Sequence, residues 1–390
     1  MSDIGNLIRP LNISGVQLRN NLILAPMAGV TDGPFRLFCS GFGAGLTVSE
    51  LASSKALLLG NKTTIRMLRF SEQPRPFSVQ IFGSNAEEMA RAAKKVEEME
   101  VCELIDINMG CPVSKVVKIG AGASLMKTPE LASEIIKTVK KAVKLPVTVK
   151  CRIGWTESQI NVRDFVKMVV DSGAEAVTVH ARTREAGYSG IADWGKLKNM
   201  QDLCGKVPFI ANGDIKSFED IKKIHEISGA QGFMIGRGAI GNPWIFELIR
   251  LSNNSCDSID ISKVEDNLGV FAEQIAPLLN IDTADPAMVT EPCGEMRLAK
   301  EENSEVKNAI EKELCFGKKY FPPEKKLEVF REHLLESLIE HGPKGVALFR
   351  VHLFAYLRGN RFASSFRREM CSERNPKKVI ETGKRFFCGE

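Results

Sequence analysis

Short apolar runs alternate with longer amphipathic segments over the first 250 residues of the chain. The runs are rich in β-branched residues and are bounded by glycine, proline or polar residues, which is typical of strands buried on both faces of a parallel sheet. There are eight of them: Leu22–Pro26, Leu46–Ser49, Phe77–Ile81, Leu104–Ile107, Pro146–Lys150, Ala176–His180, Pro208–Ala211 and Gly232–Ile235.

Helix-length segments separate these runs. They include Ala86–Glu100, Pro129–Lys144, Asn161–Ser172 and Ser217–Ser228. Asn85, with Glu88 three residues on, predicts a capped start for the first of them. Eight strand–helix units in about 230 residues predict an α/β fold, a (β/α)8 TIM barrel over residues 1–250. A doubly wound sheet usually has fewer strands, and no G-x-G-x-x-G motif follows the first run.

The alternation stops near residue 251. Residues 251–322 are rich in Ser, Asn, Asp and Glu and show no long period, so they are predicted to form an acidic insertion or linker. Residues 324–341 and 343–358 then place apolar side chains at helical spacing. We therefore expect a small C-terminal α-helical domain over residues 323–390.

Composition and charge agree with this division. The 390 residues are 44% hydrophobic and 26% charged, which excludes collagen-like, low-complexity and wholly disordered chains. The net charge of +5 is too small by itself to imply a nucleic-acid partner. Residues 251–322, however, hold 7 basic and 14 acidic residues, whereas residues 341–390 hold 11 and 4. The average conceals an acidic stretch and a basic tail.

The sequence contains no run of the roughly 20 apolar residues that a membrane helix needs. The segment Met1–Gly5 has neither the charge nor the apolar core of a secretory signal, so we expect a cytoplasmic protein without a membrane partner. The ten cysteines form no C-x-x-C pair and lack zinc-type spacing. We expect reduced thiols and no metal site.

Polar groups follow nearly every predicted strand. In TIM barrels the active site lies at the carboxyl ends of the strands, so these positions would share one face of the molecule. A single polar residue there is often only a cap, but eight together favour a site. The strand exits are Pro26-Met27-Ala28, Glu50, Gln80, Asn108–Pro112, Lys150–Arg152, His180–Thr183, Asn212-Gly213-Asp214 and Gly236-Arg237-Gly238.

The last two exits are glycine-bearing loops, where such barrels often bind phosphate through backbone N–H groups. Tight turns alone would also explain these glycines. Arg237 can add a charge-assisted contact, and the amide of Gln80 suits a planar heteroaromatic ring with imide edges. Together the exits predict a phosphate-bearing planar cofactor across the top of the barrel.

Three further side chains carry candidate chemistry. Lys150 and His180 come from adjacent strands and are expected to point toward the barrel mouth. A lysine there could form a Schiff base if its amine were desolvated; Arg152 would lower its pKa in any case. Cys111, between Gly110 and Pro112, could be a nucleophile, a proton donor or a small buried hydrophobe. No His or Asp stands beside it to activate a thiolate, which favours the protonated thiol as a general acid.

These residues stand in motifs that resemble one family. The segments run in order as APMAGVTD (25–32), GLTVSE (45–50), VQIFGS (79–84), DINMGCPVSKV (106–116), VKCRIGW (149–155), HARTREAGYSG (180–190), ANGDI (211–215) and MIGRGAIGNPWIF (234–246). The chain resembles the bacterial tRNA-dihydrouridine synthases, closest to the B type, over about residues 11–250 and more weakly over 323–388. The combination of motifs is specific; no single one is.

The resemblance implies FMN at the barrel mouth and reduction of the C5=C6 bond of uridines in the tRNA D-loop. Cys111 would protonate C5 while hydride reaches C6 from the flavin, and Asn108 would position the base. NADPH would visit transiently and needs no Rossmann motif. The implied cofactor-binding residues are Pro26, Met27, Ala28, Gln80, Lys150, His180, Asn212, Gly213, Asp214, Gly236 and Arg237. Substrate-binding residues are expected to include Asn108, Arg182, Arg358 and Arg361.

The basic tail fits such a substrate, because an enzyme that acts on one base of a folded RNA must hold the surrounding backbone. The candidate residues are Arg350, Arg358, Arg361, Arg367, Arg368, Lys377, Lys378, Lys384 and Arg385. A solvated helix face is the plainer interpretation. The acidic insertion departs from the family, and its net charge of −7 would repel RNA. We expect it to project away from the RNA-binding face or to contact an unknown partner.

Two other functions stay open. An FMN barrel acting on a free pyrimidine, in the style of dihydroorotate dehydrogenases, would share the phosphate site but would not need a basic C-terminal domain. An RNA-binding scaffold on a degenerate barrel is disfavoured, because the polar residues at the strand exits are intact.

Overall fold

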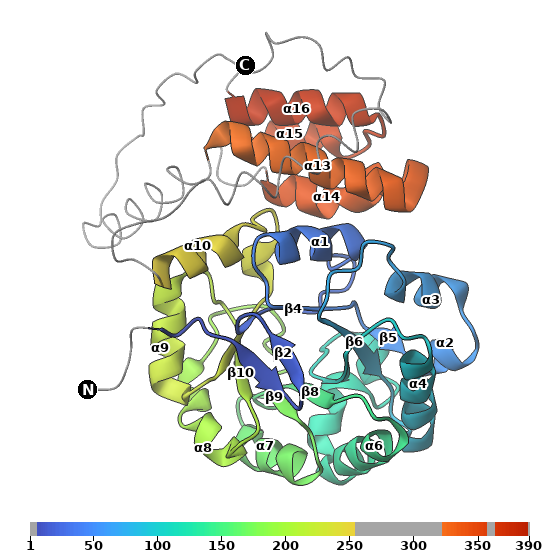
Figure 1. The fold of residues 1–390 in the computed structure, drawn as a ribbon, viewed down its shortest axis with the longest axis vertical. Helices are drawn as coiled ribbons and strands as arrows, with labels where there is room; N and C mark the ends of the chain where they lie inside the picture. The colour runs from blue at the N-terminus through green and yellow to red at the C-terminus, as the bar shows by residue number, and fades with distance from the viewer. Residues whose placement is uncertain (1–5, 254–321, 357–362, 389–390) are drawn as a thin grey trace. The chain divides into compact units, whose positions relative to one another are not determined.

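The computed structural model describes residues 6–253, 322–356 and 363–388. It divides the chain into two compact units, with the boundary after Ser255 (Figure 1). Most of the predicted insertion, and with it the expectation about where that segment projects, lies outside the described residues. Arg358 and Arg361 lie outside them as well.

The first unit is a closed barrel of eight parallel strands among its described residues (Figure 1). Each strand pairs with the next along the barrel, and the pairing of β4 with β6 joins the two parts of the ring. The strands are β3 Leu22–Leu24, β4 Leu46–Val48, β6 Phe77–Phe82, β7 Leu104–Met109, β8 Val147–Arg152, β9 Ala176–His180, β10 Phe209–Asn212 and β11 Gly232–Ile235. All eight predicted strands and the (β/α)8 fold are confirmed.

Helices surround the strands and follow them in sequence. The α-helices are α1 Gly33–Gly41, α2 Ser54–Leu58, α3 Lys62–Leu68, α4 Ala86–Glu98, α5 Ser114–Val117, α6 Pro129–Ala142, α7 Val162–Asp171, α8 Met200–Cys204, α9 Phe218–Ser228 and α10 Ile245–Asn253. Three 3-10 helices are η1 Gly122–Lys127, η2 Trp194–Leu197 and η3 Arg237–Ala239. The four predicted helices are α4, α6, α7 and α9. Asn85 caps α4 as expected, since its Oδ1 accepts a hydrogen bond from the Glu88 N–H at 2.8 Å.

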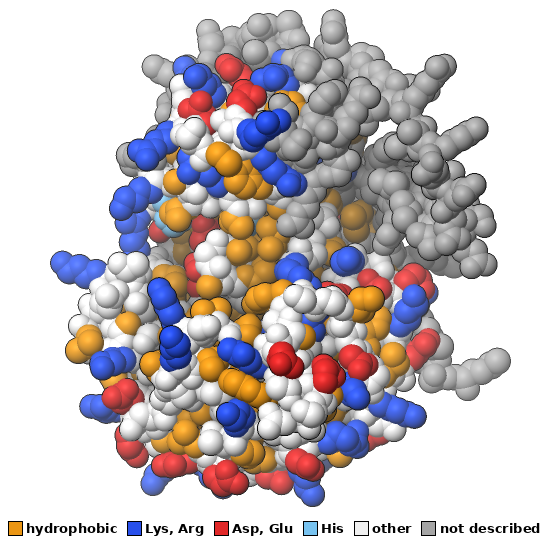
Figure 2. All heavy atoms as spheres, turned by 180° about the vertical axis from the view of Figure 1, so that it is seen from behind, with side chains coloured by type: hydrophobic (Ala, Val, Ile, Leu, Met, Phe, Trp, Pro, Cys, Tyr) orange, Lys and Arg blue, Asp and Glu red, His pale blue; other side chains and the backbone are white. Residues whose placement is uncertain are grey.

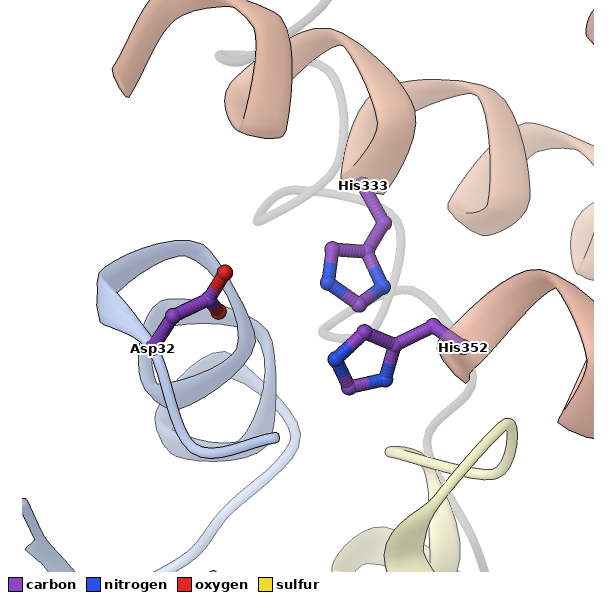
Figure 3. Close-up of side chains that lie close together, drawn as sticks. All are labelled: Asp32, His333 and His352. Atoms are coloured by element: carbon purple, nitrogen blue, oxygen red, sulfur yellow. The ribbon is translucent and has the colours of Figure 1, made fainter. Parts of the chain in front are cut away.

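Caps of this kind fix several helix starts. Asp32 begins α1 (Figure 3), where its carboxylate accepts from the Phe35 N–H at 3.0 Å. Ser217 and Asp220 form a full capping box at α9. The capped helices α1 and α9 therefore begin directly after the loops that follow β3 and β10, and their caps limit how those loops can run.

The periodicity did not indicate three short strands. β1 Leu11–Ile13 and β2 Val16–Leu18 form an antiparallel hairpin, and β5 Ala52–Ser53 pairs with β6. The hairpin's apolar side chains pack with those that begin the barrel strands, such as Leu104 and Ala176. The hairpin thus covers the amino-terminal end of the barrel interior. Strands of two or three residues are too short for alternation to be recognised in the sequence.

The second unit consists, in its described part, of α13 Pro323–His341, the 3-10 helix η6 Gly342–Lys344, α14 Gly345–Tyr356, α15 Ala363–Met370 and α16 Pro376–Cys388. The predicted helical segments over 324–341 and 343–358 correspond to α13 and α14. Phe330 is central, with ring centroids 5.4 Å from Phe349 and 5.5 Å from Tyr356. Next to Phe349, the rings of His333 of α13 and His352 of α14 lie with their centroids 4.5 Å apart and their planes tilted by 54° (Figure 3).

None of the helices that the structure describes combines the length and the apolar character needed to cross a membrane.

Candidate active site

Side chains from neighbouring strands meet at the carboxyl end of the barrel. Lys150 lies on β8, and its Nζ donates to Asn212 Oδ1 of β10 at 3.1 Å. The Asn212 Nδ2 group donates in turn to the Met234 carbonyl of β11 at 2.7 Å. His180 is in register with Asn212 on the adjacent strand. The strand-exit residues therefore lie on one face, as the barrel prediction requires.

Lys150 is a half-buried amine in cationic surroundings. Desolvation and then the charge of Arg152 lower the pKa of Lys150 to about 8, although Asp106 acts in the opposite direction. An anionic ligand beside Lys150 would stabilise its charged form by pairing with the ammonium. Lys150 is thus suited to hold an electron-rich ring or an anion.

His180 is neutral and its tautomer is defined. Its Nε2 lies 3.2 Å from Arg182 Nη1, and because a guanidinium only donates, Nε2 must accept. Nδ1 therefore carries the hydrogen. Burial, and then the charges of Lys150, Arg152, Arg182 and Arg237, hold the pKa of His180 well below its usual 6.5. The ring can donate one hydrogen bond without carrying charge.

The loops after β10 and β11 offer donors to an anion. The backbone N–H groups of Gly236 and Arg237 make no hydrogen bond to any residue that the structure describes. Gly213 has φ +123°, and a Cβ there would lie 2.9 Å from Ala192 Cβ and 3.0 Å from His180 Cδ2. Only glycine lets the His180 ring lie against this loop. Free N–H groups beside an exposed guanidinium fit a phosphate.

Asp214 stands behind this anion site. Its Oδ2 accepts from Arg182 Nη2 at 2.6 Å and its Oδ1 from Arg237 Nη2 at 2.9 Å. Burial raises the pKa of Asp214, but hydrogen bonds from Arg182 and Ala192, together with the charges of Arg182 and Arg237, outweigh it, so the pKa lies below its usual value. An ionised carboxylate repels phosphate, so the geometry gives Asp214 the task of orienting Arg237.

Two buried arginines hold the loops around the site. Arg182 donates to the carbonyls of Ser189 and Gly190 at 3.0 and 2.7 Å. Arg152 donates to the carbonyls of Thr183 and Gly187 at 2.8 and 2.7 Å. Both side chains thus tie the 183–190 segment to the strand ends. Substrate binding by Arg182 stays a prediction.

Cys111 sits in the turn after β7 and is 9% exposed. Burial raises the pKa of its thiol above the usual 9, against smaller opposing effects of a backbone hydrogen bond, Arg152 and Lys150. The thiol is therefore protonated at neutral pH, as a proton donor requires. Cys151 lies between Lys150 and Arg152 on β8, so its side chain points to the opposite side of that strand and is fully buried in the core. Burial raises the pKa of Cys151 to about 12.

The β3 exit borders the anion site. A Cβ on Gly236 would lie 3.5 Å from Met27 Sδ, so the turn carrying Pro26, Met27 and Ala28 lies beside the loop after β11. The Met27 N–H donates to Thr31 Oγ1 at 3.0 Å, which fixes this turn. Gln80 is fully buried, and its amide bonds Asp106 and Asn108.

Asp106, a carboxylate inside the buried strand β7, was not among the site residues predicted from the sequence. It accepts from Gln80 Nε2 at 2.7 Å and from Thr148 Oγ1 at 2.5 Å. A charged residue within the apolar run Leu104–Ile107 was the available signal, since such groups are rarely buried without a purpose.

The parallel barrel carries, at the carboxyl ends of its strands, loops whose free N–H groups fit a phosphate, a desolvated lysine and a protonated thiol, the arrangement expected of a TIM-barrel enzyme. Residues 23–281 match the family model described as dihydrouridine synthase (Dus), so the chain belongs to the dihydrouridine synthase family and is an oxidoreductase. The match extends into the first part of the predicted insertion.

Curated relatives agree. The chain is 41% identical to a tRNA-dihydrouridine synthase B of Pectobacterium carotovorum, over 62% of this chain and 74% of that one. It is 43% identical to the corresponding Vibrio parahaemolyticus protein, over 61% and 74%. A probable tRNA-dihydrouridine synthase of Rickettsia bellii is 39% identical over 69% and 82%. The resemblance stated from the motifs is confirmed.

Among solved structures, histamine dehydrogenase from Rhizobium sp. 4-9 aligns with a TM-score of 0.50 and 15% identity. The alignment covers 68% of this chain and 49% of that structure, so the chain spans about half its length. At this identity the likeness concerns the fold alone.

Proposed function

We propose that this protein reduces the C5=C6 bond of uridines in the D-loop of tRNA to 5,6-dihydrouridine, with FMN as cofactor and NADPH as transient reductant. The observation that carries the proposal is the protonated thiol of Cys111 on the same rim as Lys150 and the phosphate-fitting loops. A family of this activity and relatives bearing its name support it. A tRNA substrate is also the reason for expecting a cytoplasmic location.

The donors at the barrel mouth fit FMN. Bound there, FMN would supply the hydride for uracil C6. The N–H groups of Gly236 and Arg237, with the Arg237 guanidinium held by Asp214, would bind its phosphate, and Asn212 and Gly213 would shape that loop. Lys150 and the Nδ1–H of His180 would hold the ring system, and Gln80 is proposed to lie against it. Pro26, Met27 and Ala28 would line its edge.

Cys111 supplies the second hydrogen. Reduction adds a hydride at C6 and a proton at C5, so the base needs an acid on one side of its ring. The thiol gives up its proton, becomes a thiolate and is reprotonated from solvent. Lys150 and Arg152 lie close enough to stabilise that thiolate, since both lower the pKa of Cys111. Asn108 is proposed to hold the base.

The C-terminal helices are proposed to bind the tRNA backbone. Figure 2 shows Lys and Arg side chains on their surface. Some are paired, because Lys378 lies 3.6 Å from Glu373 and Arg385 lies 3.3 Å from Glu369. Such exposed ion pairs are weak and can be exchanged for phosphate. Arg368 and Lys377 are exposed as well.

The function is tested by incubating the flavin-loaded protein with NADPH and tRNA that lacks dihydrouridine, followed by mass-spectrometric mapping. We expect the mass gain of one hydrogen pair at D-loop uridines. Free uracil and orotate are assayed in parallel. Reduction of a free pyrimidine in place of tRNA would support the dihydroorotate dehydrogenase-like alternative, and a protein that takes up no flavin would support the scaffold.

Reversing the charge of Arg361 and Arg368 to Glu should weaken tRNA binding and lower its salt dependence. Each lost phosphate contact is expected to reduce the slope of log affinity against log salt by about 1. Filter binding at several KCl concentrations measures it. Lys137→Glu, at an exposed position of α6 on the outside of the barrel, is the matched control. An unchanged slope in the double variant would refute the assignment.

A further inference from the structure

A buried series of side-chain hydrogen bonds links three strands and ends at the Cys111 turn. Gln80 Nε2 donates to Asp106 Oδ2 at 2.7 Å, and Thr148 Oγ1 donates to Asp106 Oδ1 at 2.5 Å. Asn108 Nδ2 donates to Gln80 Oε1 at 2.7 Å. The Cys111 N–H donates to Asn108 Oδ1 at 2.9 Å. The series starts at a carboxylate and finishes at the backbone of the proposed acid.

The barrel's register places these residues together. Gln80, Asp106 and Thr148 are direct partners on β6, β7 and β8, and Asn108 follows Asp106 by two residues on the same side of its strand. Gln80 is 0% exposed, Asp106 4% and Asn108 7%. Water therefore competes little for these groups, and the hydrogen bonds of the series set how each amide is oriented.

The carboxylate decides which way each amide points. Asp106 Oδ2 accepts, so Gln80 must present Nε2 to it and Oε1 to Asn108. Asn108 must then present Nδ2 to Gln80, which leaves its Oδ1 for the turn. Burial raises the pKa of Asp106, but a proton on Oδ1 could be donated to the Thr148 hydroxyl. Oδ2 would still accept from Gln80, so the direction holds in either protonation state.

The turn is held on both of its sides. Asn108 Oδ1 also accepts from the Gly110 N–H at 3.2 Å, and Arg152 Nε donates to the Gly110 carbonyl at 2.7 Å. The Cys111 carbonyl also accepts from the Ala123 N–H at 3.1 Å. The Asn108 amide oxygen is therefore the group that fixes the N–H side of this turn, while Arg152 and Ala123 hold its carbonyls. Releasing the Asn108 contacts would free the direction in which the thiol points.

We propose that Asp106 is a positioning residue for Cys111, which sets the orientation of the Gln80 and Asn108 amides and through them fixes the turn that carries the thiol. The consequence for turnover rests on the proposed function, whereas the consequence for the geometry of the turn does not. Asp106 itself needs no contact with base or flavin.

The test replaces Asp106 with Leu, which is similar in shape but cannot accept. Gln80 then loses the partner that orients it. In the flavin-loaded enzyme we expect kcat for dihydrouridine formation to fall about 10- to 100-fold with little change in KM, the scale of misplacing one catalytic group. The rate at which iodoacetamide alkylates Cys111, followed by peptide mass spectrometry, should rise by about tenfold as the turn is released.

Two controls separate positioning from packing. Asp106→Asn can still offer an oxygen to Gln80 while its amide donates to the Thr148 hydroxyl, so both readouts should stay within about threefold of the original. Thr148→Val removes the hydrogen bond from Thr148 to Asp106 Oδ1 and leaves the bond between Asp106 and Gln80 in place. Both readouts should therefore again stay close to those of the original protein. Equal losses in Thr148→Val and Asp106→Leu would overturn the proposal, as would an unchanged alkylation rate in Asp106→Leu.

Should Asp106→Leu lose its flavin, Asp106→Ala is assayed by alkylation alone, and an unchanged rate at Cys111 would again overturn the proposal. Failure of the original protein to make dihydrouridine would refute the proposed function but would leave the alkylation result to decide the role of Asp106.

Discussion

Replacing Cys111 with Ala should lower dihydrouridine formation by about 100- to 10,000-fold, the usual contribution of a positioned general acid. Alanine fills the turn but carries no proton to deliver to C5. Flavin binding should persist, because the groups that fit the cofactor lie on other strands. NADPH oxidation should also persist, since it does not involve the uracil. Single-turnover reactions analysed by mass spectrometry measure the product, and flavin absorbance measures the cofactor.

Cys371→Ala is the matched control, because this exposed thiol lies in the second unit. It should leave product formation unchanged. A Cys111→Ala enzyme with unaltered yield would remove Cys111 from the acid role. The pH profile adds a second check: the thiol's pKa is raised above 9, so the acid stays protonated below that pH. Its titration should therefore lower the rate only as the pH rises beyond that value.

Residue types and periodicity predicted the barrel well because its strands are buried on both faces. Every residue of a run such as Ala176–His180 is buried, because the strand lies between the barrel interior and the helices, and such strands are therefore mostly apolar. The same rule explains why the exits carry polar side chains. The hairpin of β1 and β2 escaped recognition because three residues show too little alternation.

The sequence predicted which residues form the candidate site but not the hydrogen bonds between them. Lys150, His180 and Cys111 could be named from their places at the strand exits. The sequence could not predict which carbonyls Arg152 and Arg182 bind, because these hydrogen bonds depend on the path of the 183–190 loop. That path turns at Gly187 and Gly190, with φ of +57° and +63°. Asp214 was assigned to the phosphate from its position alone, whereas its orientation toward the arginines follows from the folded loop.

Asp106 shows how a signal can be present and still be missed. A carboxylate two residues before Asn108 lies on the same side of β7, so its inward direction follows from the strand period. Its partner Gln80 was itself a candidate, but register between strands was needed to bring the two together. Sequence order does not give that register, which the closed barrel sets.

Gly45→Ala is expected to destabilise the barrel by about 3 kcal/mol, near the upper end for forced overpacking. An ideal Cβ there would lie 2.1 Å from the Asn20 carbonyl oxygen and 2.9 Å from its carbon, both backbone atoms. Asn20 cannot retreat easily, because its Nδ2 donates to the Gly43 carbonyl at 2.8 Å and its Oδ1 accepts from the Leu22 N–H at 2.9 Å. The Gly45 N–H also donates to the Leu22 carbonyl at 2.7 Å.

The clash therefore lies just before the first residues of β3 and β4. These are at the amino-terminal end of the barrel, away from the active site, so the substitution should affect stability and not catalysis. Thermal unfolding followed by far-UV circular dichroism should show Tm lowered by about 6–12 °C for a unit of this size. Gly41→Ala, at the end of α1, is the control: its Cβ would meet nothing within 4 Å, and it should be neutral or slightly stabilising. Equal Tm values for the two variants would contradict the close approach of Gly45 to Asn20.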